Sequence, residues 1–206
     1  MLPAVPARGL VIALHGFGLT GPKMVDLLGM GEHVTRTGLA IIAPSGGNHY
    51  WHRRRAGMDP GAVVLDDIRP LGLREAGLAA DARVAFLGLS MGGYGALLLA
   101  SELGRAGTFG VVAESAALWT EAGLSDEGAF DDRGDFLAHD MFARSKALSD
   151  IPIRLDCGTD DPFIAANRAF AERVPHAEAA FDAGGHTRDY WRAHCGAQLD
   201  WLAALL

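Results

Sequence analysis

Residues 83–100 read RVAFLGLSMGGYGALLLA, and this stretch decides the fold. Residues 84–89 form an uninterrupted apolar run, typical of a strand buried on both faces, and an apolar helix follows at once. Between them, Gly88-Leu89-Ser90-Met91-Gly92 matches G-x-S-x-G, the strand–turn–helix in which a serine stands on a sharp turn. The glycines leave room where strand and helix nearly collide. We therefore predict that Ser90 is a nucleophile, rather than a chance match in a chain with 27 glycines.

The same alternation of strand and helix extends along the chain. We expect strands at 10–14, 39–43, 84–89, 109–113, 153–157 and 177–181, and helices at 22–37, 62–76, 91–103, 162–174 and 188–205. This pattern predicts an α/β fold with a mainly parallel sheet of about six strands, covered by helices on both faces. With 206 residues, of which 50% are hydrophobic, the chain predicts a single domain, residues 1–206.

A serine nucleophile needs a base, and the base needs an acid to orient it. In hydrolases with a nucleophile elbow the acid and then the histidine follow the serine along the chain. Asp160 and Asp161 follow the expected strand at 153–157, and Asp161 is preferred because it directly precedes the proline that opens a helix. His186 lies on a glycine-flanked loop after the last strand. The other histidines considered, which lie in less suitable positions, are His139, His176 and His194.

The segment LHGFGLTG, residues 14–21, contains G-x-G-x-x-G after an expected strand. A dinucleotide-binding loop calls for an acidic residue at the end of the second strand, and that strand here ends in Ile42-Ala43-Pro44-Ser45. The glycines instead favour a loop that supplies one backbone amide of an oxyanion hole. Phe17 is the first candidate and Gly18 the second, with Met91 supplying the other amide. No cofactor is expected.

Charge and cysteine content narrow the class of protein further. The net charge is −7 and the pI about 5.5, which argues against nucleic acid or an anionic membrane as the main partner. The chain has no apolar stretch of membrane-spanning length and no signal-like start, which predicts a cytoplasmic location. Cys157 and Cys195 lack C-x-x-C spacing and are expected to be free thiols rather than a disulfide. The eight histidines lack metal-ligand spacing, so no metal is expected.

Two long connections are candidates for substrate-binding loops. In the first, at 44–61, Asn48 and Trp51 are candidate pocket residues; alternatively, Trp51 packs the loop down. Its arginines, residues 53–55, either meet an acidic substrate group or pair with Asp59, Asp66 or Asp67. The second, residues 116–150, interleaves acids with aromatic residues and is expected either to form a partly helical cap, with its charges in water, or to be an ordinary solvated connection. Gly18 and Trp119 complete the candidate pocket.

Taken together, GLSMGGYGALLLA, CGTDDPF, GGHTRDYW and LHGFGLTG resemble the putative-esterase branch of the α/β-hydrolase superfamily, which includes esterase D (S-formylglutathione hydrolase) and the mycolyltransferases. The resemblance implies a cofactor-free serine hydrolase that cleaves small carboxylic esters or thioesters through an acyl-enzyme on Ser90. Asp161 and His186 match the acid and the base. The strands that family members carry before the one ending near His15 are missing here, so the first edge is expected either to be exposed or to be covered by a partner.

Two alternatives to hydrolysis remain open at this point. One is an acyltransferase that uses the same acyl-enzyme, and the other is a hydrolase-fold binding protein without catalysis. The sequence does not indicate an oligomeric state.

Overall fold

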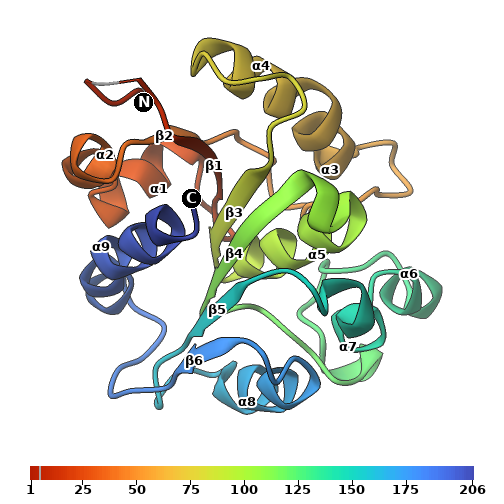
Figure 1. Ribbon diagram of the computed structural model, residues 1–206. Helices are drawn as coiled ribbons and strands as arrows, with labels where there is room; N and C mark the ends of the chain where they lie inside the picture. The colour runs from red at the N-terminus through yellow and green to blue at the C-terminus, as the bar shows by residue number, and fades with distance from the viewer. Residues whose placement is uncertain (5) are drawn as a thin grey trace.

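Six parallel strands form one sheet in the order β2-β1-β3-β4-β5-β6, in a computed structural model that describes residues 1–4 and 6–206 (Figure 1). The strands are β1 (Gly9–Leu14), β2 (Leu39–Ile42), β3 (Val84–Leu89), β4 (Thr108–Glu114), β5 (Ile153–Asp156) and β6 (Glu178–Ala180). β1, β3 and β4 are buried along their whole length, as expected for strands covered on both faces. The predicted α/β fold with a parallel sheet of six strands is confirmed.

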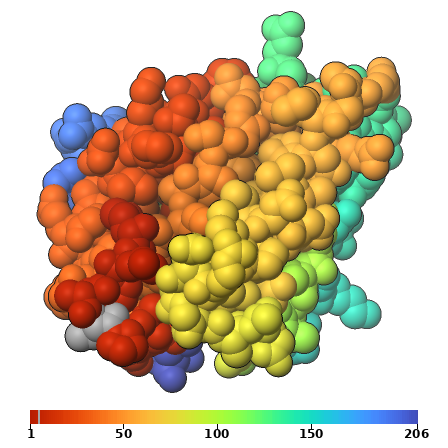
Figure 2. Space-filling model, turned by 90° about the horizontal axis from the view of Figure 1, so that it is seen from above, coloured from red at the N-terminus to blue at the C-terminus, as the bar shows by residue number. Residues whose placement is uncertain are grey.

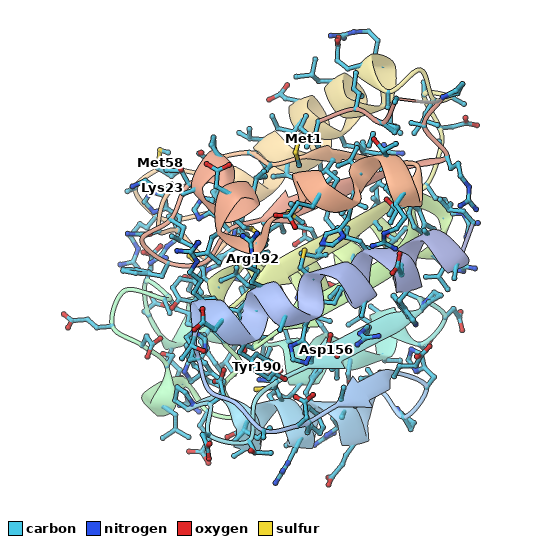
Figure 3. All side chains as sticks on the ribbon, turned by 90° about the vertical axis from the view of Figure 1, so that its left-hand side faces the viewer. Met1, Lys23, Met58, Asp156, Tyr190 and Arg192 are labelled. Atoms are coloured by element: carbon cyan, nitrogen blue, oxygen red, sulfur yellow. The ribbon has the colours of Figure 1, made fainter. Side chains whose placement is uncertain are left out.

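Helices cover both faces of this sheet (Figure 1). One face carries α1 (Gly21–Leu28), α2 (Gly31–Thr37) and α9 (Arg188–Ala204). The other carries α3 (Pro60–Ala62), η1 (Val63–Ile68), α4 (Arg69–Glu75), α5 (Met91–Gly107) and α8 (Ile164–Arg173). Figure 3 shows α9 lying across the sheet beside α1 and α2, with Arg192 between them. The Arg192 guanidinium donates to the carbonyl oxygens of Asp26 and Leu27 in α1.

Two of the expected helices differ from the structure. The helix expected at 22–37 is two helices, because Gly29 adopts a left-handed conformation (φ 65°) and ends α1. The helix expected at 62–76 begins at Pro60, where the Asp59 carboxylate caps it by accepting from the amide of Ala62. It runs through the π-helical segment η1 into α4, a change of hydrogen-bond pattern that periodicity alone does not reveal.

The first edge of the sheet, β2, is partly covered by the chain itself. The terminal ammonium group of Met1 donates to the carbonyl of Ile41 at 2.7 Å, and the carbonyl of Met1 accepts from the amide of Ile41 at 2.9 Å. Figure 2 looks onto this edge, where the N-terminal residues (red) lie next to the α4 region (yellow). The edge expected to be exposed or covered by a partner is therefore partly paired through Met1.

The segment between β4 and β5 is partly helical, with η2 (Ala122–Leu124), α6 (Arg133–Ala138), α7 (Met141–Arg144) and η3 (Ser145–Leu148). Two arginines attach it to the loop after β2. Arg54, which is 8% exposed, donates to the Asp131 carboxylate at 2.9 Å and to the carbonyls of Gly128 and Ala129. The exposed Arg55 pairs with Asp132. Arg54 and Arg55 thus pair with acids, but with acids of this segment rather than with Asp59, Asp66 or Asp67.

Within residues 1–4 and 6–206, no helix has both the length and the apolar character needed to cross a membrane. Cys157 and Cys195 are free and buried, as expected. Burial raises the pKa of each thiol to about 12, so both are protonated and unreactive at neutral pH.

Candidate active site

Ser90 lies on the turn between β3 and α5, at the carboxyl end of the sheet. Its backbone is strained, with φ 55° and ψ −119°, a conformation that non-glycine residues rarely adopt. Surrounding hydrogen bonds hold this turn: the amide of Ser90 donates to the carbonyl of Glu114, and its carbonyl accepts from the amides of Tyr94 and Ala117. The strain therefore persists because neighbouring backbone fixes it.

The glycines around Ser90 are required by close contact of the backbone. A Cβ on Gly88 would lie 1.9 Å from the carbonyl oxygen of Gly92, and a Cβ on Gly92 would lie 1.8 Å from that of Leu14. Neither position has space for any side chain. The pattern G-x-S-x-G is thus explained by the geometry of strand, turn and helix in this chain.

His186 and Asp161 meet Ser90 from two other loops. Nε2 of His186 lies 3.0 Å from Oγ of Ser90, and Nδ1 lies 2.8 Å from Oδ2 of Asp161. In this arrangement Nδ1–H donates to the carboxylate and Nε2 accepts from the serine hydroxyl. The indole of Trp191 meets the imidazole edge-on, with ring centroids 4.8 Å apart. The three residues therefore have the mutual geometry of a nucleophile, a base and an orienting acid.

Of the two candidate acids, the structure brings Asp161 to the histidine. Asp161 is buried and accepts hydrogen bonds from His186 and from the amide of Phe163 at 2.9 Å. Burial alone would raise the pKa of Asp161, but these hydrogen bonds outweigh it and hold the pKa below its usual value. The side chain of Asp160 is exposed, and its amide bonds to the carbonyl of Gly184.

The other histidines bond elsewhere. His194 bonds to Tyr190 and Asp182, His176 to the carbonyls of Leu148 and Ile151, and His139 to Asp135.

The loop after β1 presents an unpaired backbone amide. Within residues 1–4 and 6–206, the amides of Phe17 and Met91 have no protein acceptor. The amide of Gly18 instead donates to Oδ1 of Asn48 at 2.8 Å, so it is occupied. This distinguishes the two alternatives for the loop amide: Phe17 is free to face a ligand and Gly18 is not.

A cavity of about 460 Å³ opens beside Ser90 and His186, within the size range of small-molecule sites. Its wall is mainly apolar. The residues that complete it are Gly16, Phe17, Leu19, Leu27, Tyr50, Leu89, Asp126, Glu127, Phe163 and Trp191. A second cavity, of about 620 Å³, shares Asp126 and Phe163 with the first.

The four residues expected to line the pocket lie outside this wall. Trp51 is the clearest correction: it is 1% exposed, its ring packs against Gly95, and its indole N–H donates to the carbonyl of His15. Trp51 therefore holds the loop against the core of the protein, which is the alternative given for it above. Trp119 lines the second cavity, and Gly18 and Asn48 bond to each other at the surface.

A family model described as putative esterase matches residues 73–202 of the chain, more than half of its length. The chain belongs to the putative esterase family. The matched span contains Ser90, Asp161 and His186. Membership of this family indicates ester hydrolysis.

Solved structures with low sequence identity to this chain share its fold, which is the predicted α/β-hydrolase fold. A ferulic acid esterase superposes with a TM-score of 0.80 at 19% identity, over 97% of this chain and 86% of that one. The serine hydrolase FphF from Staphylococcus aureus gives 0.82 at 19%, over 98% and 90%. An S-formylglutathione hydrolase from Agrobacterium tumefaciens gives 0.80 at 16%, over 100% and 88%. No curated protein sequence matches the chain.

The sequence did not lead us to predict some of the residues that line this site. Phe163 follows the Asp-Pro pair and Trp191 lies in the first turn of the helix that begins after His186, so both could have been found by position. Tyr50 could not, because its place in the wall depends on a left-handed backbone (φ 51°). Asp126 and Glu127 are exposed to water, as expected, and they also line the open cavity, which the sequence did not reveal.

One group of potential metal ligands lies outside the cavity. Single ligand atoms of His52, Asp135 and His139 lie within 4.8 Å of one another. These side chains already bond to protein: Nδ1 of His139 donates to Asp135, and Nε2 of His52 lies 3.1 Å from the carbonyl of Ala129. The two imidazoles are tilted by 31° to each other, with centroids 4.3 Å apart. The group therefore fits a hydrogen-bonded cluster better than a metal site.

Proposed function

We propose that this putative esterase hydrolyses carboxylic esters or thioesters through an acyl-enzyme on Ser90. The observation that carries the proposal is the chain of contacts from Ser90 Oγ to His186 Nε2 (3.0 Å) and from His186 Nδ1 to Asp161 Oδ2 (2.8 Å), beside a cavity. His186 takes the serine proton as Oγ attacks the carbonyl carbon. The buried Asp161 carboxylate stabilises the imidazolium that forms.

The amides of Phe17 and Met91 hold the negative oxygen of the tetrahedral intermediate. Met91 is the first residue of α5, so its amide belongs to the positive end of a long helix. Collapse of the intermediate breaks the bond to the leaving group, which receives the proton from His186. Water then attacks the acyl-enzyme with His186 as base, and the acid is released. The residues assigned to these steps use no cofactor.

We also propose that the whole chain, residues 1–206, acts as one α/β-hydrolase domain in which residues 116–150 form a cap beside the cleft. Asp126 and Glu127 of this segment lie in the wall next to Ser90. The buried Arg54–Asp131 pair attaches the segment to the loop after β2. The cap thus joins two of the loops that surround the cleft.

The proposal is tested by labelling with a fluorophosphonate and by turnover of p-nitrophenyl acetate. We expect one covalent adduct by intact mass on the wild type, none on Ser90→Ala, and turnover in the wild type only. Adduct formation without release of acid, but with transfer to an added alcohol, would make the protein an acyltransferase. A folded wild type that neither reacts nor turns over ester would be a binding protein.

A further inference from the structure

Two carboxylates lie in the wall of the cavity that holds Ser90. Asp126 and Glu127 belong to the cap, between η2 and α6. Within residues 1–4 and 6–206, no lysine or arginine lines this cavity. Lys23 lies at the same end of the molecule, near Met58 in Figure 3, but outside the wall.

Neither carboxylate is neutralised by an ion pair in the part of the chain that the structure describes. This differs from the next acids along the cap, since Asp131 and Asp132 pair with Arg54 and Arg55. The negative charge at the cleft is therefore available to a ligand.

Tyr50 fixes one of these carboxylates at the wall. Its hydroxyl donates to Oδ2 of Asp126 at 3.3 Å. The tyrosine is itself buried and packs against Trp119 and Phe130, with ring centroids 5.6 and 6.4 Å away. Burial, together with the nearby Asp126 charge, raises the pKa of Tyr50, so the phenol remains a donor. Asp126 is thus positioned by a rigid aromatic neighbour.

The rest of the wall suits a cation as well. Phe17, Tyr50, Phe163 and Trp191 present aromatic rings to the same cavity. Aromatic faces attract ammonium groups, most strongly where carboxylates stand nearby and water is partly excluded. An anionic group in the same place would meet two like charges and no counter-charge.

We propose that this site selects esters by charge, accepting neutral and cationic substrates and discriminating against anionic ones. The inference rests on the proposed esterase function and narrows its substrate class. A unit charge about 4 Å from a carboxylate changes affinity about fivefold in water, and more where the dielectric constant is lower. We therefore expect cationic substrates to be favoured over anionic ones by at least about tenfold at low salt, an advantage that shrinks at high salt.

The test uses two matched series, because the charge can sit on either side of the scissile bond. One series varies the acyl group: p-nitrophenyl esters of 4-(trimethylammonio)butyrate, of its neutral isostere 5,5-dimethylhexanoate, and of glutarate. The other varies the leaving group: acetylthiocholine, S-(3,3-dimethylbutyl) thioacetate and the S-acetyl derivative of 3-mercaptopropionate. kcat/KM is measured for each after subtraction of the enzyme-free rate. A substrate that is not turned over is measured as a competitive inhibitor of p-nitrophenyl acetate hydrolysis.

The double variant Asp126→Asn/Glu127→Gln should reduce the cation-to-anion ratio at least about tenfold in one or both series. The control is Asp66→Asn/Asp67→Asn, which changes the net charge by the same amount on exposed positions outside the cleft. It should leave the ratio as in the wild type. Equal ratios in the wild type and the Asp126/Glu127 variant, with p-nitrophenyl acetate still hydrolysed, would overturn the charge proposal alone. Absence of all turnover and of fluorophosphonate labelling would overturn the proposed function itself.

Discussion

Gly46 donates its backbone N–H to Nε2 of His15 across 3.0 Å. The other ring nitrogen, Nδ1, lies 2.8 Å from the carbonyl of Gly16 and donates to it. This buried imidazole therefore ties the loop that carries Phe17 to the loop after β2. It touches no part of the cleft that a substrate would occupy, so it acts by positioning the backbone.

Replacing His15 should leave the backbone amide of Phe17 less firmly positioned, while Ser90 remains in place. We expect His15→Ala to lower kcat by about tenfold to a hundredfold, less than the loss of a whole oxyanion donor, with a smaller change in KM. Labelling of Ser90 should be slower yet still complete. His49→Ala, in the loop after β2 and without a side-chain hydrogen bond among the described residues, is the control and should behave as the wild type. Equal kcat for both variants would contradict the positioning role.

Buried His15 also predicts a loss of stability in mild acid. Burial lowers the pKa of His15, partly offset by its hydrogen bond to Gly16. The unfolded chain therefore binds a proton, near the usual pKa of about 6.5, before the folded chain does. Stability is unaffected well above this pH and falls as the pH drops below it. Between pH 7.5 and 5.5 the Tm of the wild type should fall a few degrees more than that of His15→Gln. Parallel curves would contradict this assignment.

Asp160 and Asp161 are adjacent but should differ sharply in their effect on catalysis. Asp161→Asn removes the carboxylate that orients His186, and we expect kcat to fall by about 10³- to 10⁴-fold. Asp160→Asn alters an exposed side chain and should remain within about twofold of the wild type. Both variants should stay folded by circular dichroism. A large loss for Asp160→Asn with an active Asp161→Asn would reverse the assignment.

The part of the site built from contiguous motifs could be predicted from the sequence. Gly88 is required by its close approach to Gly92, a constraint that acts within five residues, whereas Gly92 is required by its close approach to Leu14 of β1. Asp161 follows the largely buried strand β5 and His186 follows the edge strand β6, and parallel strands bring their carboxyl ends to one edge. Local steric rules and strand order are therefore enough to assemble these three residues.

The wall of the cavity could not be predicted in the same way. Tyr50 and Trp51 are consecutive and both have positive φ. With this backbone, the Trp51 ring lies buried beneath the loop and the Tyr50 ring lies in the wall of the cleft. Asp126 and Glu127 reach the wall because Arg54 and Arg55 bind the cap at Asp131 and Asp132, some 75 residues away in sequence. Such contacts depend on tertiary packing, which composition and periodicity do not encode.

The two arginines that bind the cap should contribute unequally to stability. Arg54 is buried and also donates to the carbonyls of Gly128 and Ala129, so Arg54→Met removes a donor from both oxygens and leaves Ala129 with only His52. Arg55 is 71% exposed at its side chain, and its pair with Asp132 is screened by water. We expect Arg54→Met to lower the Tm by several degrees and Arg55→Met by one degree or less. Equal shifts would mean that the buried pair does not hold the cap.

Phe163 should control the size of the acyl group that the cleft accepts. Its ring lies in the wall of both cavities, with its centroid 5.4 Å from the His186 ring and 5.8 Å from Trp119, so it divides the space beside Ser90. Its backbone amide holds Asp161 and is unaffected by a change of side chain. We expect Phe163→Ala to join the cavities and raise kcat/KM for p-nitrophenyl 4-phenylbutyrate relative to the acetate by about tenfold, as expected for burial of a few more methylene groups.

The matched variant Phe163→Leu keeps a smaller side chain between the cavities and should show an intermediate ratio. Turnover of the acetate reports on the triad separately from the space beside it. If Phe163→Ala lowers kcat equally for short and bulky esters, the ring serves to hold His186 in place. A rise confined to the bulky ester shows that the ring limits the acyl group, because only a substrate long enough to pass the ring gains from its removal.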